Sequence, residues 1–266
     1  MIRVLSGAAL AVLAIGVVWF ASPPIFEAVA FALLLASVIE LIALATASGI
    51  PVPRWAVMAG ALLTLATFCE LLSVPQLSTE VVLMTQLVVM SVIAMATWRG
   101  GSDALATIAA ALFPSLYLSI PIGAIVAIRE SGGPAPLFLL MLTVMVSDTA
   151  QYYTGRLTGR RPLASTISPK KTIEGAIGGV VFGTALFAVV GRWWLPIVPL
   201  MLRVVLGIGI VLVGIAGDLF ESMLKRSAGV KDSSSMIPGH GGVLDRIDAL
   251  LFAAPFFYVV GRFITL

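Results

Sequence analysis

The stretch that decides the fold runs from Leu200 to Asp248 and reads LMLRVVLGIGIVLVGIAGDLF followed by ESMLKRSAGVKDSSSMIPGHGGVLDRID. Its first part, Leu200–Phe220, is an apolar run long enough to cross about 30 Å of hydrocarbon as a helix. Its second part, Ser222–Asp248, gathers charges of both signs and the only histidine, His240. Burying unpaired charge in hydrocarbon is expensive, so a membrane protein that concentrates charge in one loop is expected to use it. The stretch predicts a polar, phosphate-handling site at the mouth of a helical membrane domain.

The composition places the whole chain in the same class. Of its 266 residues, 60% are hydrophobic and 11% are charged, whereas soluble domains carry roughly 25% charged residues. The apolar residues form blocks near the length of a membrane helix, which predicts an all-α, polytopic membrane protein rather than a barrel. The net charge of +3 is better explained by loop lysines and arginines on one side of a membrane than by nucleic-acid binding. With one cysteine, Cys69, and one histidine, an intramolecular disulfide and a Cys- or His-rich metal site are excluded, so any metal would be held by oxygen atoms.

Short turns that contain proline or glycine separate nine predicted membrane spans. The spans are Val4–Phe20, Ile25–Ala47, Trp55–Leu72, Val81–Trp98, Ala104–Ile128, Pro136–Tyr153, Gly175–Val190, Leu200–Phe220 and Ala249–Phe263. Pro114 and Pro121 fall inside the fifth span and are expected to kink it or to break it into two half-helices. The apolar run after Arg3 fits a secretory signal or an uncleaved first helix, and its length favours the helix.

The lysines and arginines predict the orientation, because cytoplasmic loops are enriched in them. With nine spans, one side would carry twelve basic residues: Arg3, Arg54, Arg99, Arg156, Arg160, Arg161, Lys170, Lys171, Lys225, Arg226, Lys231 and Arg246. The other side would carry four: Arg129, Arg192, Arg203 and Arg262. We therefore expect the N-terminus and the two long polar loops, Thr154–Glu174 and Glu221–Asp248, in the cytoplasm, and the C-terminus outside.

Two regions are expected along the chain: N-terminal membrane helices in residues 1–133, and a catalytic membrane region with two cytoplasmic loops in residues 134–266. The N-terminal region carries isolated carboxylates, Glu27, Glu40 and Glu70. Each could be a snorkelling residue at a helix end, a protonated core group or a functional acid, and Glu40 and Glu70 lie deeper in their spans. The small residues of Gly175–Gly183 predict close packing of the seventh helix rather than a cofactor loop.

Two acid pairs are the first chemical signal. Asp218 and Glu221 are three residues apart at the end of the eighth span, and Asp245 and Asp248 are three apart at the start of the ninth. Residues at this spacing share a helix face, so the pairs are well placed to share divalent cations. Ordinary pairing with lysine and arginine at helix ends is the alternative.

Phosphate-compatible groups surround these acids. Gly241 and Gly242 would let backbone N–H groups approach an anion closely. The only histidine, His240, could act as a general base or as a group that orients its neighbours, and a lone loop histidine more often orients. Ser222 lies on the same helix face as Asp218. The candidate phosphate donors of this loop are Lys225, Arg226, Lys231 and Arg246.

The earlier polar loop contributes SPKKTIEG, Ser168–Gly175. Ser168 starts a turn, and Lys170 and Lys171 precede the helix that Thr172 opens. The helix dipole favours anions there, so these residues form a plausible triphosphate grip, with a positive-inside topology signal as the alternative. Asp148, at the inner end of the sixth span, is expected to pair or to bind substrate rather than to face lipid.

These residues resemble the phosphatidate cytidylyltransferase, or CDP-diacylglycerol synthase, family. The family pattern S-x-x-K-R-x4-K-D-x5-P-x-H-G-G-x-x-D-R-x-D is met at every fixed position from Ser222 to Asp248. The SPKKTxEG segment and the stretch around Asp148 also resemble the family, so the likeness covers roughly the C-terminal half. Gln151 stands where family members often have a small residue.

The resemblance implies that CTP and phosphatidate give CDP-diacylglycerol and pyrophosphate. It also implies carboxylate-bound Mg²⁺, with K⁺ as a further candidate ion, and Asp218, Asp245 and Asp248 as metal ligands; Glu221 joins them through its spacing. The candidate catalytic residues are Asp218, Asp245, Asp248, Lys225 and His240. The candidate substrate-binding residues are Asp148, Ser168, Lys170, Lys171, Thr172, Ser222, Arg226, Lys231, Gly241, Gly242 and Arg246.

Two other classes fit less well. A secondary transporter would explain intramembrane acids and a proline-broken span, but it predicts inverted repeats, which the sequence lacks. A CDP-alcohol phosphotransferase would need an Asp-Gly…Ala-Arg motif that is absent. We expect an inner-membrane enzyme with its active site facing the cytoplasm, the lipid bilayer as its surroundings, no nucleic-acid partner, and small-residue faces compatible with a homodimer.

Overall fold

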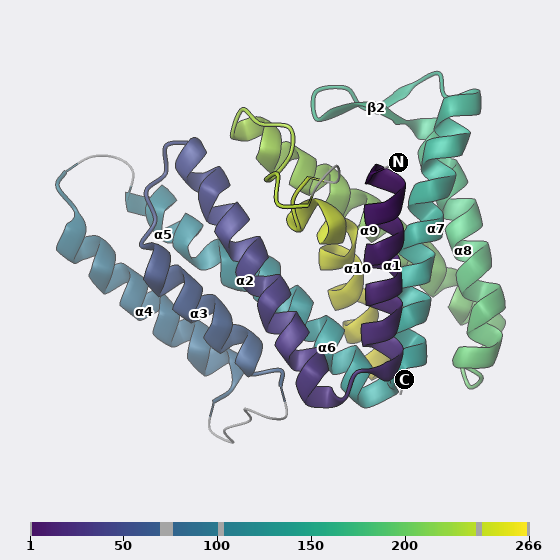
Figure 1. Ribbon diagram of the computed structural model, residues 1–266, viewed down its shortest axis with the longest axis horizontal. Helices are drawn as coiled ribbons and strands as arrows, with labels where there is room; N and C mark the ends of the chain where they lie inside the picture. Colours follow the sequence, from purple (N-terminus) through teal and green to yellow (C-terminus); the bar gives the residue numbers. More distant parts are fainter. Residues whose placement is uncertain (1, 70–76, 101–103, 238–240, 265–266) are drawn as a thin grey trace. The chain divides into compact units, whose positions relative to one another are not determined.

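The computed structural model describes residues 2–69, 77–100, 104–237 and 241–264, with only the backbone described for residues 2–6 and 10. In these residues the chain forms helices joined by short loops and one small β-hairpin (Figure 1). It divides into two compact units. The first comprises Met1–Ala127 and Ser227–Arg246, and the second comprises Ile128–Arg226 and Ile247–Leu266. The charged segment at residues 227–246 therefore packs with N-terminal helices.

The first unit is built from helices that pack around an apolar core. Leu34, Leu65 and Leu118 are fully buried within it. A proline at the start of α2 suits the first turn, where its missing N–H has no partner to lose. The elements are α1 (Ile2–Phe20), α2 (Pro23–Ala47), α3 (Arg54–Ala66), α4 (Thr79–Thr97), α5 (Ala104–Pro114), η1 (Ser115–Ser119) and the start of α6 (Ile120–Gly132).

The predicted fifth span, which its prolines were expected to kink or break, is interrupted but stays one continuous helical run from Ala104 to Gly132. The residues Ser115–Ser119, which follow Pro114, form a π-helical turn between α5 and α6. Proline removes a backbone donor from the helix ladder, and a π turn is one way to accommodate this. The buried hydroxyl of Ser119 donates to the carbonyl of Ala61 at 2.9 Å, which fastens the turn to α3.

The second unit contains α7 (Pro134–Thr158), β1 (Pro162–Ala164), β2 (Ser168–Thr172), α8 (Ile173–Trp194), α9 (Leu200–Ser227) and most of α10 (Leu244–Phe263). The predicted close packing of the Gly175–Gly183 run is confirmed. A Cβ atom at Gly175 would lie 2.7 Å from the carbonyl oxygen of Gln151 on α7. One at Gly183 would lie 2.6 Å from Val211 on α9, so α8 can approach both neighbours only without side chains there.

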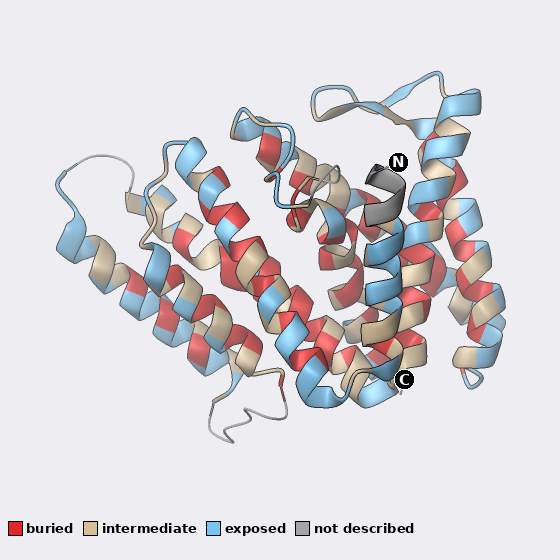
Figure 2. Ribbon diagram, in the orientation of Figure 1, coloured by how far each residue is buried: buried red, intermediate tan, exposed pale blue. Residues whose placement is uncertain are grey.

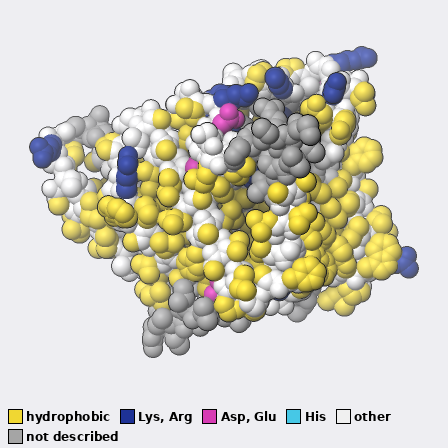
Figure 3. Space-filling model, in the orientation of Figure 1, with side chains coloured by type: hydrophobic (Ala, Val, Ile, Leu, Met, Phe, Trp, Pro, Cys, Tyr) yellow, Lys and Arg dark blue, Asp and Glu magenta, His cyan; other side chains and the backbone are white. Residues whose placement is uncertain are grey.

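Length and composition make this an all-α, polytopic membrane protein, as predicted. Among the described helices, six are long and apolar enough to cross a membrane: Pro23–Ala47, Thr79–Thr97, Ala104–Gly132, Pro134–Thr158, Ile173–Trp194 and Leu200–Ser227. Large apolar side chains are exposed along them, for example Leu105 at 80% and Met201 at 81%. Figure 2 shows exposed residues, in pale blue, along many of the helices. Hydrophobic side chains cover much of the visible surface, as expected of a protein solvated by lipid (Figure 3). The count of nine spans stays a prediction.

The hairpin was not predicted. β1 and β2 pair antiparallel, with Pro162 opposite Thr172 and Ala164 opposite Ser168, so Ser168 begins a strand where the sequence predicted a turn. The strands are short and partly exposed, and they lack the apolar alternation that identifies a strand from sequence. The hairpin presents Lys170 and Lys171 ahead of α8.

Candidate active site

Three carboxylates from three helices of the second unit interact electrostatically. They are Asp148 on α7, Asp218 on α9 and Asp248 in the first turns of α10. The charge of Asp218 acts on Asp148, and the charges of Asp218, Glu221 and Asp148 act on Asp248. The sequence predicted a site role for each, and the fold places them within electrostatic range of one another although they are up to 100 residues apart in the chain.

A glycine permits the approach of α9 to α10 at this point. A Cβ atom at Gly217 would lie 2.7 Å from the carbonyl oxygen of Asp248 and 3.1 Å from the Cβ of Phe252. A real Cβ atom essentially never lies within 3.0 Å of such an atom, so only glycine fits without a shift. Gly217 thus allows its neighbour Asp218 to share a site with Asp248.

Lys171 and Gln151 hold the acids in place. The ammonium group of Lys171, on β2, forms an ion pair with Asp218. The amide of Gln151 donates to Asp148 at 3.0 Å and to the Ser147 hydroxyl at 3.3 Å. Gln151, the residue that departs from the family pattern, therefore donates a hydrogen bond to the Asp148 carboxylate.

Next on α9 lies a buried ion pair. Glu221 and Lys225 are paired at i, i+4 spacing, with side chains 0% and 10% exposed. Ser222 is on the same helix, and its hydroxyl oxygen lies 3.5 Å from Asp218 Oδ1, at the limit of a hydrogen bond. A role for Glu221 in metal binding, or for Lys225 in phosphate binding, would require this pair to open.

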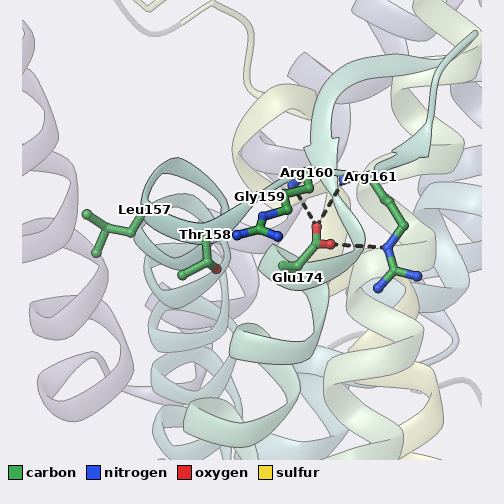
Figure 4. Close-up of a pocket in the computed structure, with 6 residues that line it drawn as sticks. All are labelled: Leu157, Thr158, Gly159, Arg160, Arg161 and Glu174. Atoms are coloured by element: carbon green, nitrogen blue, oxygen red, sulfur yellow. Dashed lines mark hydrogen bonds and ion pairs between the residues drawn. The ribbon is translucent and has the colours of Figure 1, made fainter.

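Helix α8 begins with a cap and a carboxylate clamp. The Thr172 hydroxyl accepts a hydrogen bond from Gly175 N at 3.1 Å, which gives this predicted substrate-binding residue a structural role as N-cap. Glu174 accepts hydrogen bonds from the backbone N–H groups of Arg160 and Arg161 at 3.0 and 3.2 Å, and from the Arg161 side chain at 3.3 Å. Figure 4 shows the carboxylate between the two arginines.

A cavity of about 430 Å³ adjoins this clamp, lined by Leu157, Thr158, Gly159, Arg160, Arg161 and Glu174. Its size and two guanidinium groups would suit a phosphate-bearing ligand. From the sequence, Arg160 and Arg161 were expected only to set the orientation in the membrane, and no site role was predicted for Glu174. The signal that could have found them is the Arg-Arg pair followed by an acid in the first turn of the next helix.

The first unit holds a second acidic cluster, which contains Asp245. Its carboxylate accepts hydrogen bonds from Ser233 N at 3.0 Å, from the Ser233 hydroxyl at 2.9 Å and from Gly242 N at 2.8 Å. Gly241 has φ +77°, and a Cβ atom there would lie 2.7 Å from the Asp245 carboxylate. The backbone N–H of Gly242, which was expected to approach a bound anion, therefore donates to the Asp245 carboxylate.

The remaining predicted residues are more exposed. Lys170, Arg226, Lys231 and Arg246 all lie at the surface of the described chain. Ser168 is half-buried in β2. His240, with Pro238 and Gly239, lies outside the described residues, and so does Glu70.

The donor set fits a hard divalent cation. Asp148, Asp218 and Asp248 offer only oxygen ligands, which Mg²⁺ prefers. With Glu221 they make four carboxylates in the second unit, and Lys171 and Lys225 are paired with two of them. Among the described residues, no three Asp, Glu, His or Cys side chains converge closely enough to hold one ion by themselves. Mg²⁺ usually takes one or two protein carboxylates and completes its shell with water and substrate phosphates, so this arrangement is compatible with it.

Comparison with known proteins identifies the class. The chain matches the cytidylyltransferase family over residues 1–264 and belongs to it. It is 38% identical to a phosphatidate cytidylyltransferase of Helicobacter pylori over 154 residues, 58% of this chain and 57% of the relative. It is 43% identical to one of Aquifex aeolicus over 124 residues, 47% and 46% of the two chains. A third, of Thermotoga maritima, is 37% identical over 174 residues, 64% of each. The chain thus spans from about half to just under two thirds of the length of these relatives.

Proposed function

We propose that this protein is a phosphatidate cytidylyltransferase, which converts CTP and phosphatidate into CDP-diacylglycerol and pyrophosphate for phospholipid synthesis. The observation that carries the proposal is the cluster of Asp148, Asp218 and Asp248 with Lys171, in a chain that belongs to the cytidylyltransferase family. The six helices that are long and apolar enough to cross a membrane support a lipid as one of the two substrates.

The reaction forms one bond and breaks one. A phosphate oxygen of phosphatidate attacks the α-phosphorus of CTP, and the bond from that phosphorus to the oxygen bridging the α- and β-phosphates breaks. The electron pair leaves with pyrophosphate. Because the lipid phosphate is already ionised, no strong general base is needed, and catalysis comes mainly from positioning and charge neutralisation.

Both substrates are polyanions, so cations must neutralise them at close range. Asp218 and Asp248 would hold Mg²⁺, with Asp148 beside them, while Asp245 is a separate candidate ligand in the first unit; when bound, Mg²⁺ would supply electrophilic charge at the phosphates. Lys171 forms an ion pair with Asp218 and would turn toward phosphate once another cation takes over that carboxylate. Lys170, Arg226 and Arg246 have exposed side chains and would supply further contacts to phosphate.

The charge distribution supports a cytoplasmic active site in the inner membrane, where CTP is available. The lipid tails would stay in the bilayer while the headgroup reaches the acids at the helix ends. The proposal is compatible with a homodimer and with a second, monovalent ion.

The decisive test is direct. Purified full-length protein in detergent receives labelled CTP, phosphatidate and Mg²⁺, and labelled lipid is counted. We expect a CDP-lipid product that depends on both substrates, with one pyrophosphate released per lipid formed. Free cytidine nucleotide as the only product, or equal labelling when diacylglycerol replaces phosphatidate, would refute the proposal.

A further inference from the structure

A buried glutamate in the first unit makes contacts that the proposed chemistry does not use. Glu40, in α2, is only 2% exposed, and its two carboxylate oxygens accept four hydrogen bonds. Oε1 accepts from the Ser234 hydroxyl at 2.6 Å and from Val243 N at 2.9 Å. Oε2 accepts from the Ser233 hydroxyl at 2.9 Å and from Leu244 N at 2.8 Å. Each oxygen thus binds one hydroxyl and one backbone N–H.

All four partners lie in the charged segment, about 200 residues further along the chain. Val243 and Leu244 form the start of α10, where backbone N–H groups have no partner within the helix and the helix dipole favours a negative charge. Burying a carboxylate is expensive unless it is well bonded, and here donors surround both oxygens. Glu40 therefore acts as the anion that closes the N-terminus of α10.

The same bonds reach a predicted metal ligand. The Ser233 hydroxyl oxygen lies 2.9 Å from both Glu40 Oε2 and Asp245 Oδ2, so its one hydrogen is shared between the two carboxylates and the side chain connects them. Gly242 leaves room for this contact, because a Cβ atom there would lie 2.5 Å from Glu40 Oε2. Moving Glu40 would displace Ser233 and, through it, the carboxylate of Asp245.

We propose that Glu40 is a positioning residue, which anchors residues 233–234 and 243–244 and thereby sets the orientation of Asp245 and the start of α10. This inference rests on the proposed function for its effect on turnover, but not for the anchor itself. It gives the N-terminal half, which carries no chemical motif, a specific task in the site.

The test is the substitution Glu40→Gln, which keeps the size of the side chain. Whichever oxygen becomes NH₂ can no longer accept, so two of the four bonds are lost and a donor faces an N–H group. The matched control is Ser37→Ala, since Ser37 is buried one turn earlier on α2 and its hydroxyl donates only to Leu33 in the same helix. Ser234→Ala is a milder second variant that removes one donor.

Hydrogen exchange of the full-length protein without substrate reads the anchor directly. We expect Glu40→Gln to speed exchange at least roughly tenfold in peptides that cover residues 233–244, and Ser37→Ala to leave these peptides unchanged. Turnover is measured on the same samples. Losing an outer partner of a metal ligand typically costs 10–100-fold, so we expect kcat/KM to fall by about that factor and half-activation to need about tenfold more Mg²⁺.

The two arms separate the possible failures. Unchanged exchange at residues 233–244 in both Glu40→Gln and Ser234→Ala would overturn the anchor. Faster exchange with an unchanged Mg²⁺ requirement would overturn the positioning role and leave only a structural one. If the wild-type protein forms no CDP-lipid, the proposed function is wrong. The exchange result would still decide whether Glu40 anchors its partners in the charged segment.

Discussion

The close approach of α9 to α10 at Gly217 gives the sharpest prediction for activity. In Gly217→Ala the new Cβ atom would lie 2.7 Å from the carbonyl oxygen of Asp248, whereas ordinary contact begins at 3.4 Å. The two helices must therefore separate locally by about 0.7 Å, the difference between these distances. Because Asp218 directly follows Gly217, this separation would change the spacing between Asp218 and Asp248.

A misplacement of about 1 Å at a reacting centre can cost roughly 100-fold in rate, so we expect Gly217→Ala to lower kcat at least tenfold. Overpacking of this kind also costs about 1–3 kcal/mol of stability, partly offset by the better helix propensity of alanine. The assay is the initial rate of CDP-lipid formation, with thermal unfolding in detergent measured beside it.

Gly214→Ala is the matched control, because it lies one turn earlier on α9 and its Cβ atom would meet Ala249 at an ordinary 3.8 Å. It gains the same helix propensity without the clash, so its rate should stay near that of the wild type. If Gly217→Ala is as active as Gly214→Ala, the close approach at Gly217 does not set the geometry of the acids.

Two further predictions concern the segment that leads into α8. Thr172→Ala removes the cap on Gly175 N and should destabilise the protein by about 1 kcal/mol, whereas Thr172→Ser keeps the hydroxyl; equal melting temperatures for the two variants would contradict the capping role. Lys171→Met should raise the KM for CTP more than Lys170→Met does, because Lys171 pairs with Asp218 while Lys170 is exposed and its charge is screened. Saturation kinetics would contradict this if Lys170→Met had the larger effect.

Local patterns predicted much of the fold and part of the site. Apolar runs of membrane-spanning length identified the helices, and Pro114 predicted the interruption that the π-helical turn provides. Spacing and charge selected Asp218 and Asp248, which do interact. These features are encoded within one or two helical turns, which is why the sequence alone reveals them.

The unpredicted features depend on contacts between distant segments. Glu40 looked like an isolated acid because its partners, Ser233, Ser234 and the start of α10, come about 200 residues later. Asp245 and Asp248 looked like one pair, but Asp245 bonds within the first unit while Asp248 interacts with acids of the second. The hairpin before α8 is too short and too polar for its alternation to be read.

The central claim is that Asp218 and Asp248 hold the cation that brings two polyanions together. The most direct measurement is Mn²⁺ binding to the purified protein with CTP present, followed by electron paramagnetic resonance, for wild type, Asp248→Asn and the control Glu80→Gln, whose exposed carboxylate lies in the first turn of α4. We expect Asp248→Asn to weaken Mn²⁺ binding at least roughly tenfold and to abolish turnover, with Glu80→Gln matching the wild type. Equal Mn²⁺ affinity in all three proteins, with turnover retained in Asp248→Asn, would contradict the claim.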